Sequence, residues 1–474
     1  MTYRRPTGRR NGLYDKPTDE LAALMQTGWA DSRQLDLAPS PQVPYAAVRR
    51  DALSARFPGE RLVIPAGTLK IRSNDDLYAF RPSSAYTHLT GDQTPEAALV
   101  LNPVPEGGHE PVAYLLPRSS RDNGEFWLNA ATGELWVGRR HALEEAEQLL
   151  GLPCRDIGDL VADLTRAAVP TRLHQGHDAA LDQRLGTAAD RDAELGEFLD
   201  ELRLIKDPWE IEQLRFACAA TTRGFEDAAR GLTTAIATSE RWIEGTFNRR
   251  ARLEGNGVGY GTICAAGPHA TIMHWVRNDG PVRPGELLLL DAGVETNDLY
   301  TADVTRTLPI SGRFSPLQRE IYDAVHEAQE AGMAAVGPGA RYRDFHEASQ
   351  RVLAAHLVNW GFLDGPADRV YELGLQRRYT MAGTGHMLGL DVHDCAQATT
   401  AQYVDGHLEA GMVLTVEPGL YFQPDDLTVP AEFRGIGVRI EDDLLVTDAG
   451  HENLSADLPR TADEVESWMA ALTG

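Results

Sequence analysis

The sequence is short of cysteine and of basic residues, and it has no long hydrophobic run. Its four cysteines lie far apart with no CxxC pair, which suits neither a disulfide framework nor a thiolate zinc site and indicates a reducing cytoplasm. No run of about 18 apolar residues occurs, so no membrane-spanning helix is expected. The basic opening, residues 1–12, is not followed by an apolar segment, so we expect a flexible tail rather than a signal peptide.

The excess of acidic residues limits the class of partner. The 70 Asp and Glu residues against 45 Lys and Arg give a formal charge of -25. A nucleic-acid or membrane partner is therefore not expected, since phosphate groups are bound by clustered Lys and Arg. A solvated acidic surface explains most of this charge, but it does not explain carboxylates placed inside apolar strand patterns.

The length and the order of expected elements predict an α/β chain with an arm and two domains. A chain of 474 residues is too long for one ordinary core. Residues 1–44 form the arm, with a short helix at 18–25. Strands alternate with helices in residues 45–200, which is typical of an α/β domain; we expect strands at 61–65, 97–101 and 111–116, and helices at 45–56, 142–150 and 187–200.

The second domain, residues 201–474, gives one order of elements twice. Two helices precede strands in each half: first helices at 208–230 and 238–254 with strands near 258–266 and 286–310, then helices at 316–336 and 342–359 with strands near 382–393, 412–422 and 436–447. Ser315, Pro316 and Gln318 provide a capping box for the third helix. The repeated order predicts a pseudo-two-fold domain, and a site is expected where the halves abut.

Four carboxylates end or interrupt apolar strand patterns, two in each half. Asp291 ends a run of leucines, and Asp303 lies in the returning segment, so an antiparallel hairpin would bring them together. Glu417 ends the second apolar strand of the other half. Alternation in the next strand puts Arg439 and Glu441 on one face. Taken singly, each is more often a cap, turn or edge residue.

Residues 382–394 place His386 and His393 in a segment with three glycines, where backbone can approach an ion or a substrate. A histidine in such a run is more often a core or turn residue than a ligand. If the four carboxylates converge with His386, however, their charge requires protons or cations.

Two divalent ions would offset this charge. The oxygen-rich donor set favours manganese, while cobalt, zinc and iron are compatible with it. Ions about 3.5 to 4 Å apart would bridge and acidify a water, giving a hydroxide for attack on a carbonyl. The residues therefore indicate metal-assisted hydrolysis.

The segments that carry these residues resemble a known family. LLLLDAG, TADVTRTLP, GHMLGLDVHD, TVEPGLY and GVRIEDDLLVT, in this order, are similar to the dinuclear metallopeptidases of pita-bread fold. The most similar branch is aminopeptidase P, or Xaa-Pro aminopeptidase, and the likeness reaches upstream to residues 64–91. It implies a creatinase/prolidase-like N-terminal domain, a C-terminal pita-bread domain, and hydrolysis of the N-terminal Xaa-Pro bond of small peptides. It also implies a homodimer or homotetramer.

The resemblance implies a role for each matching residue. Asp291 and Asp303 would bind one ion, Asp303 and Glu441 would bridge, and His386 and Glu417 would complete the other shell. Glu417 would also carry a proton during attack.

Three further residues receive roles outside the metal shell. His274 would contact the substrate near the scissile bond, His393 would polarise the carbonyl or stabilise the oxyanion, and Arg439 would hold a ligand carboxylate. His269 and His407 match no role and are interpreted as surface or packing residues.

One position departs from the family. Ala382 stands where the family usually has a histidine on the wall of the proline pocket, which removes a donor and opens space beside the metals. An alternative hypothesis is therefore an iron-dependent oxygenase or other redox enzyme on the same scaffold. A second alternative is a non-catalytic binding module, although such a module needs no metal ligands.

Overall fold

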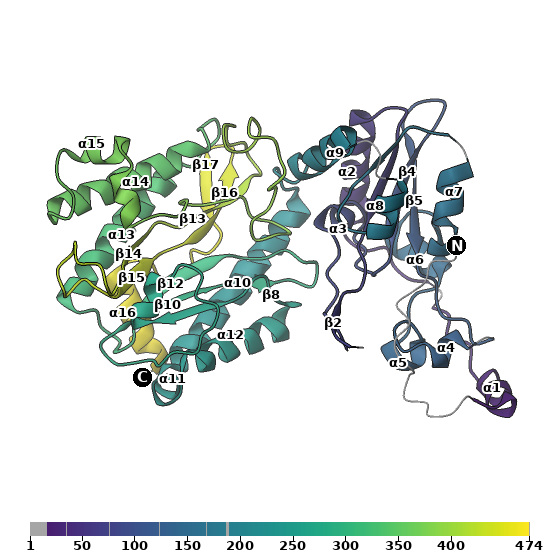
Figure 1. Cartoon of the computed structure of the whole chain (residues 1–474), viewed down its shortest axis with the longest axis horizontal. Coiled ribbons are helices and arrows are strands. Elements are labelled where there is room, and N and C mark those ends of the chain that lie inside the picture. The colour runs from purple at the N-terminus through teal and green to yellow at the C-terminus, as the bar shows by residue number, and fades with distance from the viewer. Residues whose placement is uncertain are drawn as a thin grey trace. The chain divides into compact units, whose positions relative to one another are not determined.

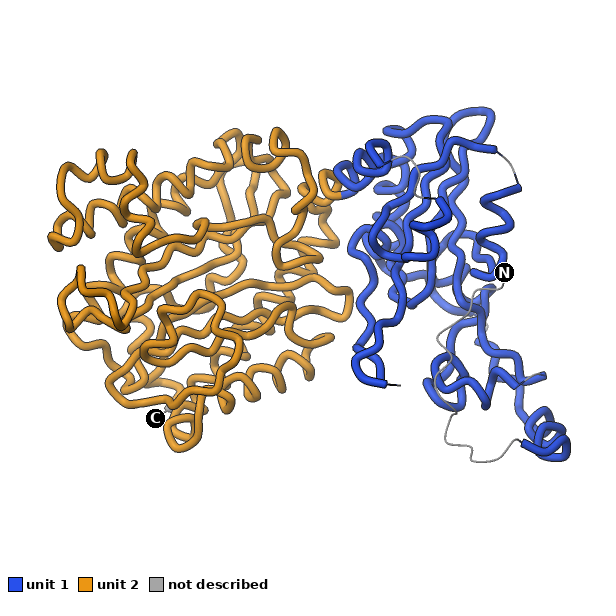
Figure 2. The backbone as a smooth tube through the Cα atoms, in the orientation of Figure 1, with its two compact units in different colours: residues 1–199 blue, residues 200–474 orange. Residues whose placement is uncertain are grey.

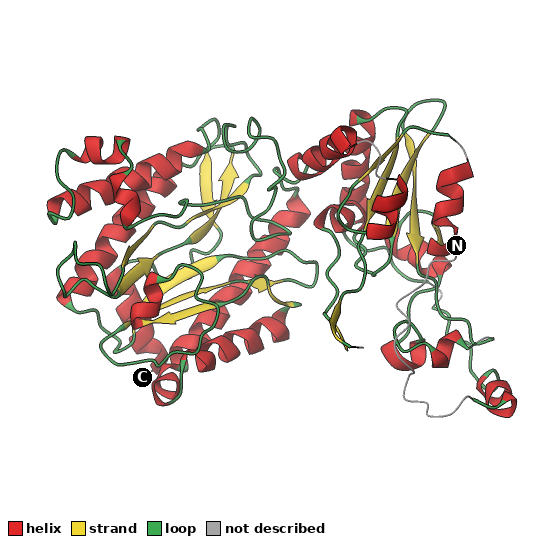
Figure 3. Cartoon of the chain, viewed as in Figure 1, coloured by secondary structure: helices red, strands yellow, loops and turns green. Residues whose placement is uncertain are grey.

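The computed structural model describes residues 17–34, 36–74, 76–122, 124–166, 168–185 and 189–473. The chain divides into two compact units, residues 1–199 and residues 200–474 (Figure 2). Both units mix helices with strands (Figure 3), which confirms the α/β class. The division into an arm and domains at 1–44, 45–200 and 201–474 stays a prediction, and the expected tail lies outside the described residues. Within the described residues, none of the helices combines the length and apolar character needed to cross a membrane.

Unit 1 is built on a mixed five-stranded sheet of order β6-β5-β4-β1-β7. β4 pairs antiparallel with β1 and β5, whereas β7 and β6 add parallel strands at the two edges. The strands are β1 (Arg61–Pro65), β4 (Ala98–Pro103), β5 (His109–Leu115), β6 (Cys154–Asp156) and β7 (Thr171–Leu173), and β2 (Ile71–Ser73) pairs with β3 (Asp76–Leu77) outside this sheet. The three predicted strands, β1, β4 and β5, lie at the centre of the sheet and are therefore almost wholly apolar. The edge strands β6 and β7 are short and have no apolar run from which they could be predicted.

Helices accompany the sheet of unit 1. Thr18 begins the first helix as predicted, because its hydroxyl accepts from the backbone N–H of Leu21. The helices are α1 (Asp19–Met25), α2 (Val43–Arg56), α3 (Ser84–Thr90), α4 (Glu125–Leu128), α5 (Glu134–Val137), α6 (Leu143–Leu150), α7 (Leu160–Arg166), α8 (Ala179–Leu185) and α9 (Ala189–Glu201), with the 3-10 turn η1 (Ile157–Asp159).

Unit 2 gives the predicted order twice (Figure 1). The first half has α10 (Pro208–Arg230), α11 (Leu232–Ala237) and α12 (Glu240–Glu254), then β8 (Gly257–Val258), β9 (Ile263–Ala266), η2 (Gly267–Thr271), β10 (Leu287–Ala292), β11 (Val294–Glu295) and β12 (Val304–Pro309). α10 packs on α12, and both helices contact the strands of this half.

The second half follows the same plan. It has α13 (Pro316–Ala334), α14 (Arg343–Asn359), α15 (Ala367–Glu372) and η3 (Leu375–Arg378), then β13 (Val413–Val416), β14 (Gly419–Phe422), β15 (Ile436–Arg439), β16 (Asp442–Thr447), β17 (Gly450–Asn453) and α16 (Ala462–Thr473). Ser315 and Gln318 form the predicted capping box, with each side chain accepting from the backbone of the other. α13 packs on α14 and contacts β13, β14 and β15.

The strand predicted near 382–393 is wrong, because this segment is an irregular loop. Its backbone still follows β13: Leu388 N–H donates to the Val413 carbonyl, and the His386 carbonyl accepts from Thr415 N–H. A Cβ at Gly385 would collide with the Thr415 carbonyl oxygen. The apolar residues gave a strand-like pattern, but the glycines let the chain turn while it stays close to the sheet.

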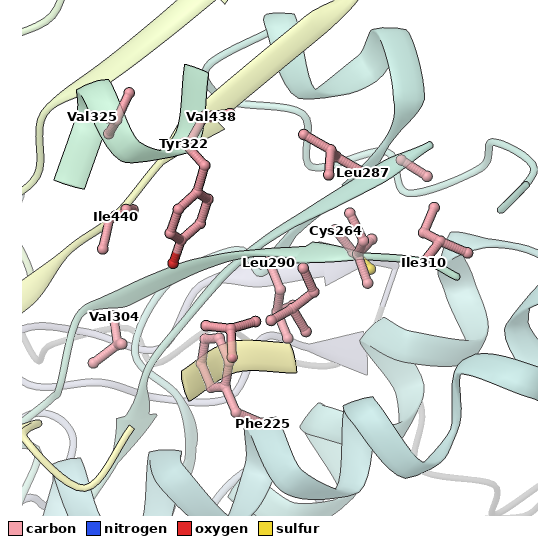
Figure 4. Packing of buried hydrophobic residues seen from close by; sticks show 14 of the residues in the cluster. Phe225, Cys264, Leu287, Leu290, Val304, Ile310, Tyr322, Val325, Val438 and Ile440 are labelled. Atoms are coloured by element: carbon pink, nitrogen blue, oxygen red, sulfur yellow. The ribbon is translucent and has the colours of Figure 1, made fainter. Parts of the chain in front are cut away.

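The two halves share one core and meet along β12 and β15. Leu290 and Val304 of the first half, together with Val438 and Ile440 of the second, belong to one buried cluster (Figure 4). Across the seam, Thr307 Oγ1 donates to the Arg439 carbonyl at 2.9 Å. The backbone N–H of Glu441 donates to the Thr305 carbonyl at 3.1 Å. The seam therefore brings together the strand ends that carry the predicted carboxylates.

Candidate metal centre

The antiparallel pairing of β10 with β12 brings Asp291 and Asp303 together. Asp291 lies opposite Thr305, and Asp303 directly precedes β12. Tyr260 lies between the two carboxylates, with its hydroxyl 2.6 Å from Asp291 Oδ1 and 2.5 Å from Asp303 Oδ1. Burial, and then the two aspartates, hold the pKa of Tyr260 well above its ordinary value. Tyr260 therefore keeps its one proton, which it donates to one carboxylate at a time, and its hydroxyl lies between the two.

The second half supplies Glu441, between β15 and β16, and Glu417, directly after β13. Glu441 Oε2 accepts from Thr305 Oγ1 at 2.6 Å. Its other oxygen, Oε1, is buried and has no hydrogen-bond partner in the part of the chain that the structure describes. A buried carboxylate oxygen without a donor is costly unless a cation or a proton satisfies it. Asp303, His386 and Glu441 each offer a ligand atom, and these atoms all lie within 4.8 Å of one another.

His386 faces these carboxylates from the 382–393 loop. Its Nε2 lies 3.3 Å from Asp303 Oδ2 and 3.4 Å from Glu417 Oε1. On the other side of the ring, Nδ1 lies 3.1 Å from the Met387 carbonyl oxygen. Because a carbonyl can only accept, Nδ1 carries a proton and Nε2 is the nitrogen available to a metal, as is usual for ligating histidines.

Arg439 is buried beside the carboxylates, and each of its three nitrogens donates to an acceptor. Its Nη2 donates to Asp291 Oδ2, its Nη1 to the Tyr421 hydroxyl at 2.9 Å and its Nε to Thr305 Oγ1 at 3.1 Å. The guanidinium thus fixes Asp291 directly and Glu441 through Thr305. It compensates one negative charge of the cluster.

The electrostatics of the cluster favour a bound cation. Burial, the largest cause, raises the pKa of Asp291 and that of Glu441, with neighbouring Asp303 adding to both. Burial likewise raises the pKa of Glu417 to about 7. Burial alone would lower the pKa of His386, but Asp303 and Glu417 together raise it to about 9. Carboxylates that retain protons, and an imidazole that gains one, are expected where divalent cations would otherwise balance the charge.

His393 and His274 are two exposed imidazoles from different segments. The rings of His386 and His393 meet edge to face with centroids 4.4 Å apart. Burial lowers the pKa of His393, and the nearby His386 and His274 act in the same direction. His274, in the segment between η2 and β10, is exposed, as is His393. His393, in ring contact with His386, can therefore reach a ligand that approaches the carboxylates.

The remaining predicted positions lie elsewhere. Ala382 is an exposed residue at the start of the loop. His407 is also exposed, in an isolated bridge with Arg341. His269, interpreted as a surface or packing residue, is half-buried, stacks on Trp275 and contacts a buried glutamate, which agrees with packing.

Sequence reasoning missed Tyr260 and Thr305. Thr305 was within reach, because a period of two from Asp303 puts it on the same face of the strand. Tyr260 lies in a glycine-rich stretch, Gly257 to Gly261. Nothing in that pattern indicates a contact with Asp303, which is more than forty residues away. Four carboxylates and an imidazole that converge at the seam of the two halves are donors of the kind that metal-dependent hydrolases use.

Comparisons with known proteins agree with this class. Residues 212–448 match the model of metallopeptidase family M24, and residues 46–172 match the aminopeptidase P N-terminal domain. Xaa-Pro aminopeptidase 2 of Streptomyces coelicolor is 68% identical over 467 residues, which cover 98% of this chain and 99% of that protein. The chain belongs to metallopeptidase family M24, within its aminopeptidase P branch.

Solved structures of Escherichia coli aminopeptidase P give the same assignment. They match with a TM-score of 0.82 and 32% identity, covering 92% of this chain and 99% of that chain. They include a glutamate-to-alanine variant with substrate, a complex with the inhibitor Pro-Leu and a zinc-substituted enzyme with product. The N-terminal domain followed by a pita-bread domain is therefore confirmed. None of these matches supports the oxygenase alternative, and the metallopeptidase assignment argues against a mere binding module.

Proposed function

We infer that the chain is a metal-dependent Xaa-Pro aminopeptidase, which hydrolyses the bond between the first residue of a small peptide and a proline at the second position. The observation that carries this function is the convergence of Asp303, His386 and Glu441 at the seam of unit 2. The similarity to Xaa-Pro aminopeptidase 2 along nearly the whole of both chains supports the substrate class.

We propose that Asp291, Asp303, His386, Glu417 and Glu441 hold two divalent ions. Four carboxylates and one imidazole suit hard ions, so we propose Mn²⁺, and Co²⁺, Zn²⁺ and Fe²⁺ fit the same donors. When bound, the ions supply Lewis acidity, which acidifies water and polarises a carbonyl. Among the solved relatives, the E. coli enzyme has been obtained with zinc substituted.

The remaining roles belong to groups that move or hold protons. Glu417, with a pKa raised to about 7 by burial, can accept and release a proton near neutral pH, which suits a general base. His393 has a lowered pKa, so it is a neutral imidazole at neutral pH and donates one N–H toward the carbonyl oxygen. His274 contacts the substrate near the scissile bond, and Arg439 holds Asp291 in place.

We also propose a cytoplasmic homodimer or homotetramer. All four cysteines are free and buried, which supports a reducing compartment. The association state is proposed from the resemblance to the family, and light scattering coupled to gel filtration measures it directly.

The function is tested with matched peptides. Metal-loaded protein is incubated with an Xaa-Pro-Yaa peptide and with the corresponding Xaa-Ala-Yaa peptide, and release of the first residue is quantified. We expect release from the proline peptide and little from the alanine peptide. Glu417→Gln is expected to lower kcat at least about a hundredfold, whereas Glu409→Gln, an exposed glutamate before β13, serves as the charge-matched control. Absence of release with manganese, cobalt and zinc alike would overturn the proposal.

A further inference from the structure

His269, which received no role from the sequence, belongs to a buried cluster next to His274. Its ring stacks on the indole of Trp275, with centroids 3.8 Å apart and an interplanar angle of 23°. Its Nδ1 lies 2.8 Å from Glu240 Oε1. Trp275 directly follows His274 in the chain and is buried, while His274 itself is exposed.

Glu240, the first residue of α12, is the centre of this cluster. Its side chain is 0% exposed. Besides His269, Oε1 accepts from the backbone N–H of Ala266 at 2.8 Å. Oε2 accepts from Trp275 Nε1 at 2.9 Å and from the backbone N–H of Gly280 at 2.7 Å. The carboxylate of Glu240 therefore accepts hydrogen bonds from both ends and from the middle of segment 266–280. Hydrogen bonds to a carboxylate are stronger than those between neutral groups.

The packing around Glu240 leaves little freedom. A Cβ at Gly280 would collide with the His269 imidazole and lie 2.9 Å from Glu240 Oε2. On the return side of the segment, the buried Asn278 accepts from Cys264 N–H and donates to the Thr262 carbonyl, both at 2.8 Å. The backbone that carries His274 is thus held on both sides.

His274 needs such support because it is exposed. Trp275, the next residue, packs in a buried cluster with Ile263 and Tyr421. Both of these residues lie beside the site, because Ile263 pairs with Asp291 and the Tyr421 hydroxyl accepts from Arg439. The backbone carbonyl of His274 accepts from Val276 N–H at 3.1 Å. The indole of Trp275 donates to Glu240 and stacks on His269. These contacts hold the peptide unit that follows His274.

We propose that Glu240, His269 and Trp275 are positioning residues that hold His274 at the candidate metal centre. The inference rests on the proposed function, in which His274 contacts the substrate. Because segment 266–280 is held in place before the substrate binds, no conformational entropy has to be lost to order it during the reaction. None of the three residues is a proposed metal ligand, so their effect is expected on substrate turnover and not on metal content.

A double-mutant cycle tests this coupling. The variants are Trp275→Phe, which keeps a ring but removes the donor to Glu240, His269→Phe, which keeps the stacking surface, and Glu240→Gln. Each is made alone and together with His274→Ala. Glu244→Gln, one turn further along α12, is the matched control. The measurements are kcat and KM for an Xaa-Pro-Yaa peptide, metal content per chain and the melting temperature.

We expect each single variant to lower kcat/KM about tenfold or more at unchanged metal content, as for loss of a hydrogen bond to a charged group. In the His274→Ala background, the same changes are expected to cost less than about twofold, and Glu244→Gln is expected to be silent in both backgrounds. Trp275→Phe and His269→Phe keep the test available if Glu240→Gln does not fold.

Two results would overturn the inference: equal losses with and without His274, which indicate a purely structural role, or a loss of bound metal in the single variants. If His274→Ala alone leaves hydrolysis unchanged, the role proposed for His274 fails instead. Absence of hydrolysis by the wild-type protein would refute the proposed function itself.

Discussion

Tyr260 is the residue on which the geometry of two proposed ligands depends. Its one hydroxyl lies within hydrogen-bond distance of Asp291 and Asp303. Removing it takes a hydrogen-bond partner from both carboxylates, while Arg439 still holds Asp291. Partners of metal ligands typically affect metal affinity by about 10- to 100-fold.

Tyr260→Phe is therefore expected to weaken binding of the divalent ions by about tenfold or more. Competition with a chelator of known affinity measures this change. Tyr114→Phe is the matched control, because Tyr114 also donates to an aspartate, Asp163, at 3.0 Å, but in unit 1. Unchanged metal affinity in Tyr260→Phe, or an equal loss in both variants, would show that this hydroxyl does not organise the site.

Local sequence patterns predict some residues of the site and miss others. Asp291, Asp303, Glu417 and Glu441 could be predicted because each carboxylate breaks an apolar strand pattern, which is a local signal. Tyr260 and Glu240 could not, since their partners lie many residues away and no periodicity links them. The contact of His269 with Glu240 could not be predicted for the same reason, because the two residues are 29 positions apart in the chain.

At the scale of elements, the 382–393 loop brings His386 close to Asp303 and Glu441, although its secondary structure was predicted wrongly. The segment was predicted as a strand, yet His386 faces the carboxylates because the loop follows the edge of β13. Gly385 makes this possible: a Cβ there would collide with the Thr415 carbonyl oxygen and lie 2.9 Å from Phe345 Cε2. At Gly383 the nearest such atom is 3.9 Å away.

These two glycines form a matched pair for mutation. Gly385→Ala must displace the loop from β13, and an overpacked contact costs about 1–3 kcal/mol. We expect it to lower both metal affinity and kcat/KM by about tenfold or more, while Gly383→Ala remains within about twofold of wild type. Metal titration and steady-state kinetics measure the difference. Similar behaviour of the two variants would contradict the proposed dependence of His386 on the close approach of the loop.

At the scale of the whole molecule, metal binding and folding stability are linked through the titrating groups of the site. Glu417 has a pKa of about 7 in the folded chain against an ordinary value of 4.5. The stability that its protonation contributes is present below pH 4.5 and is lost as the pH rises through 7. His386, raised from 6.5 to about 9, contributes stability below pH 6.5 that is lost as the pH rises through 9.

Metal removal is therefore expected to destabilise the chain more at high pH than at low pH. Glu417 alone accounts for about 3 kcal/mol at full effect. Melting temperatures of chelator-treated and metal-loaded protein, measured from pH 5 to pH 9, give the difference, which is expected to widen with pH. Glu417→Gln is expected to reduce this widening. A difference that stays constant with pH would mean that protons and metal ions do not compete at this site.

The overall architecture was readable from the sequence because two halves repeat one order of elements, and each half ends its strands with acidic residues. The order of elements does not predict how the two halves join. The hydrogen bond from Glu441 N–H to the Thr305 carbonyl, across the seam, sets the register that lets β12 and β15 share one site.

The most direct test of the central claim is a metal titration of activity. Metal-free protein is titrated with Mn²⁺ while release of the first residue from an Xaa-Pro-Yaa peptide is followed and bound metal is counted. The proposed site predicts no release without metal, and activity that rises with binding to a limit of two ions per chain. Hydrolysis that persists after complete metal removal, or no hydrolysis when the site is saturated, would contradict it.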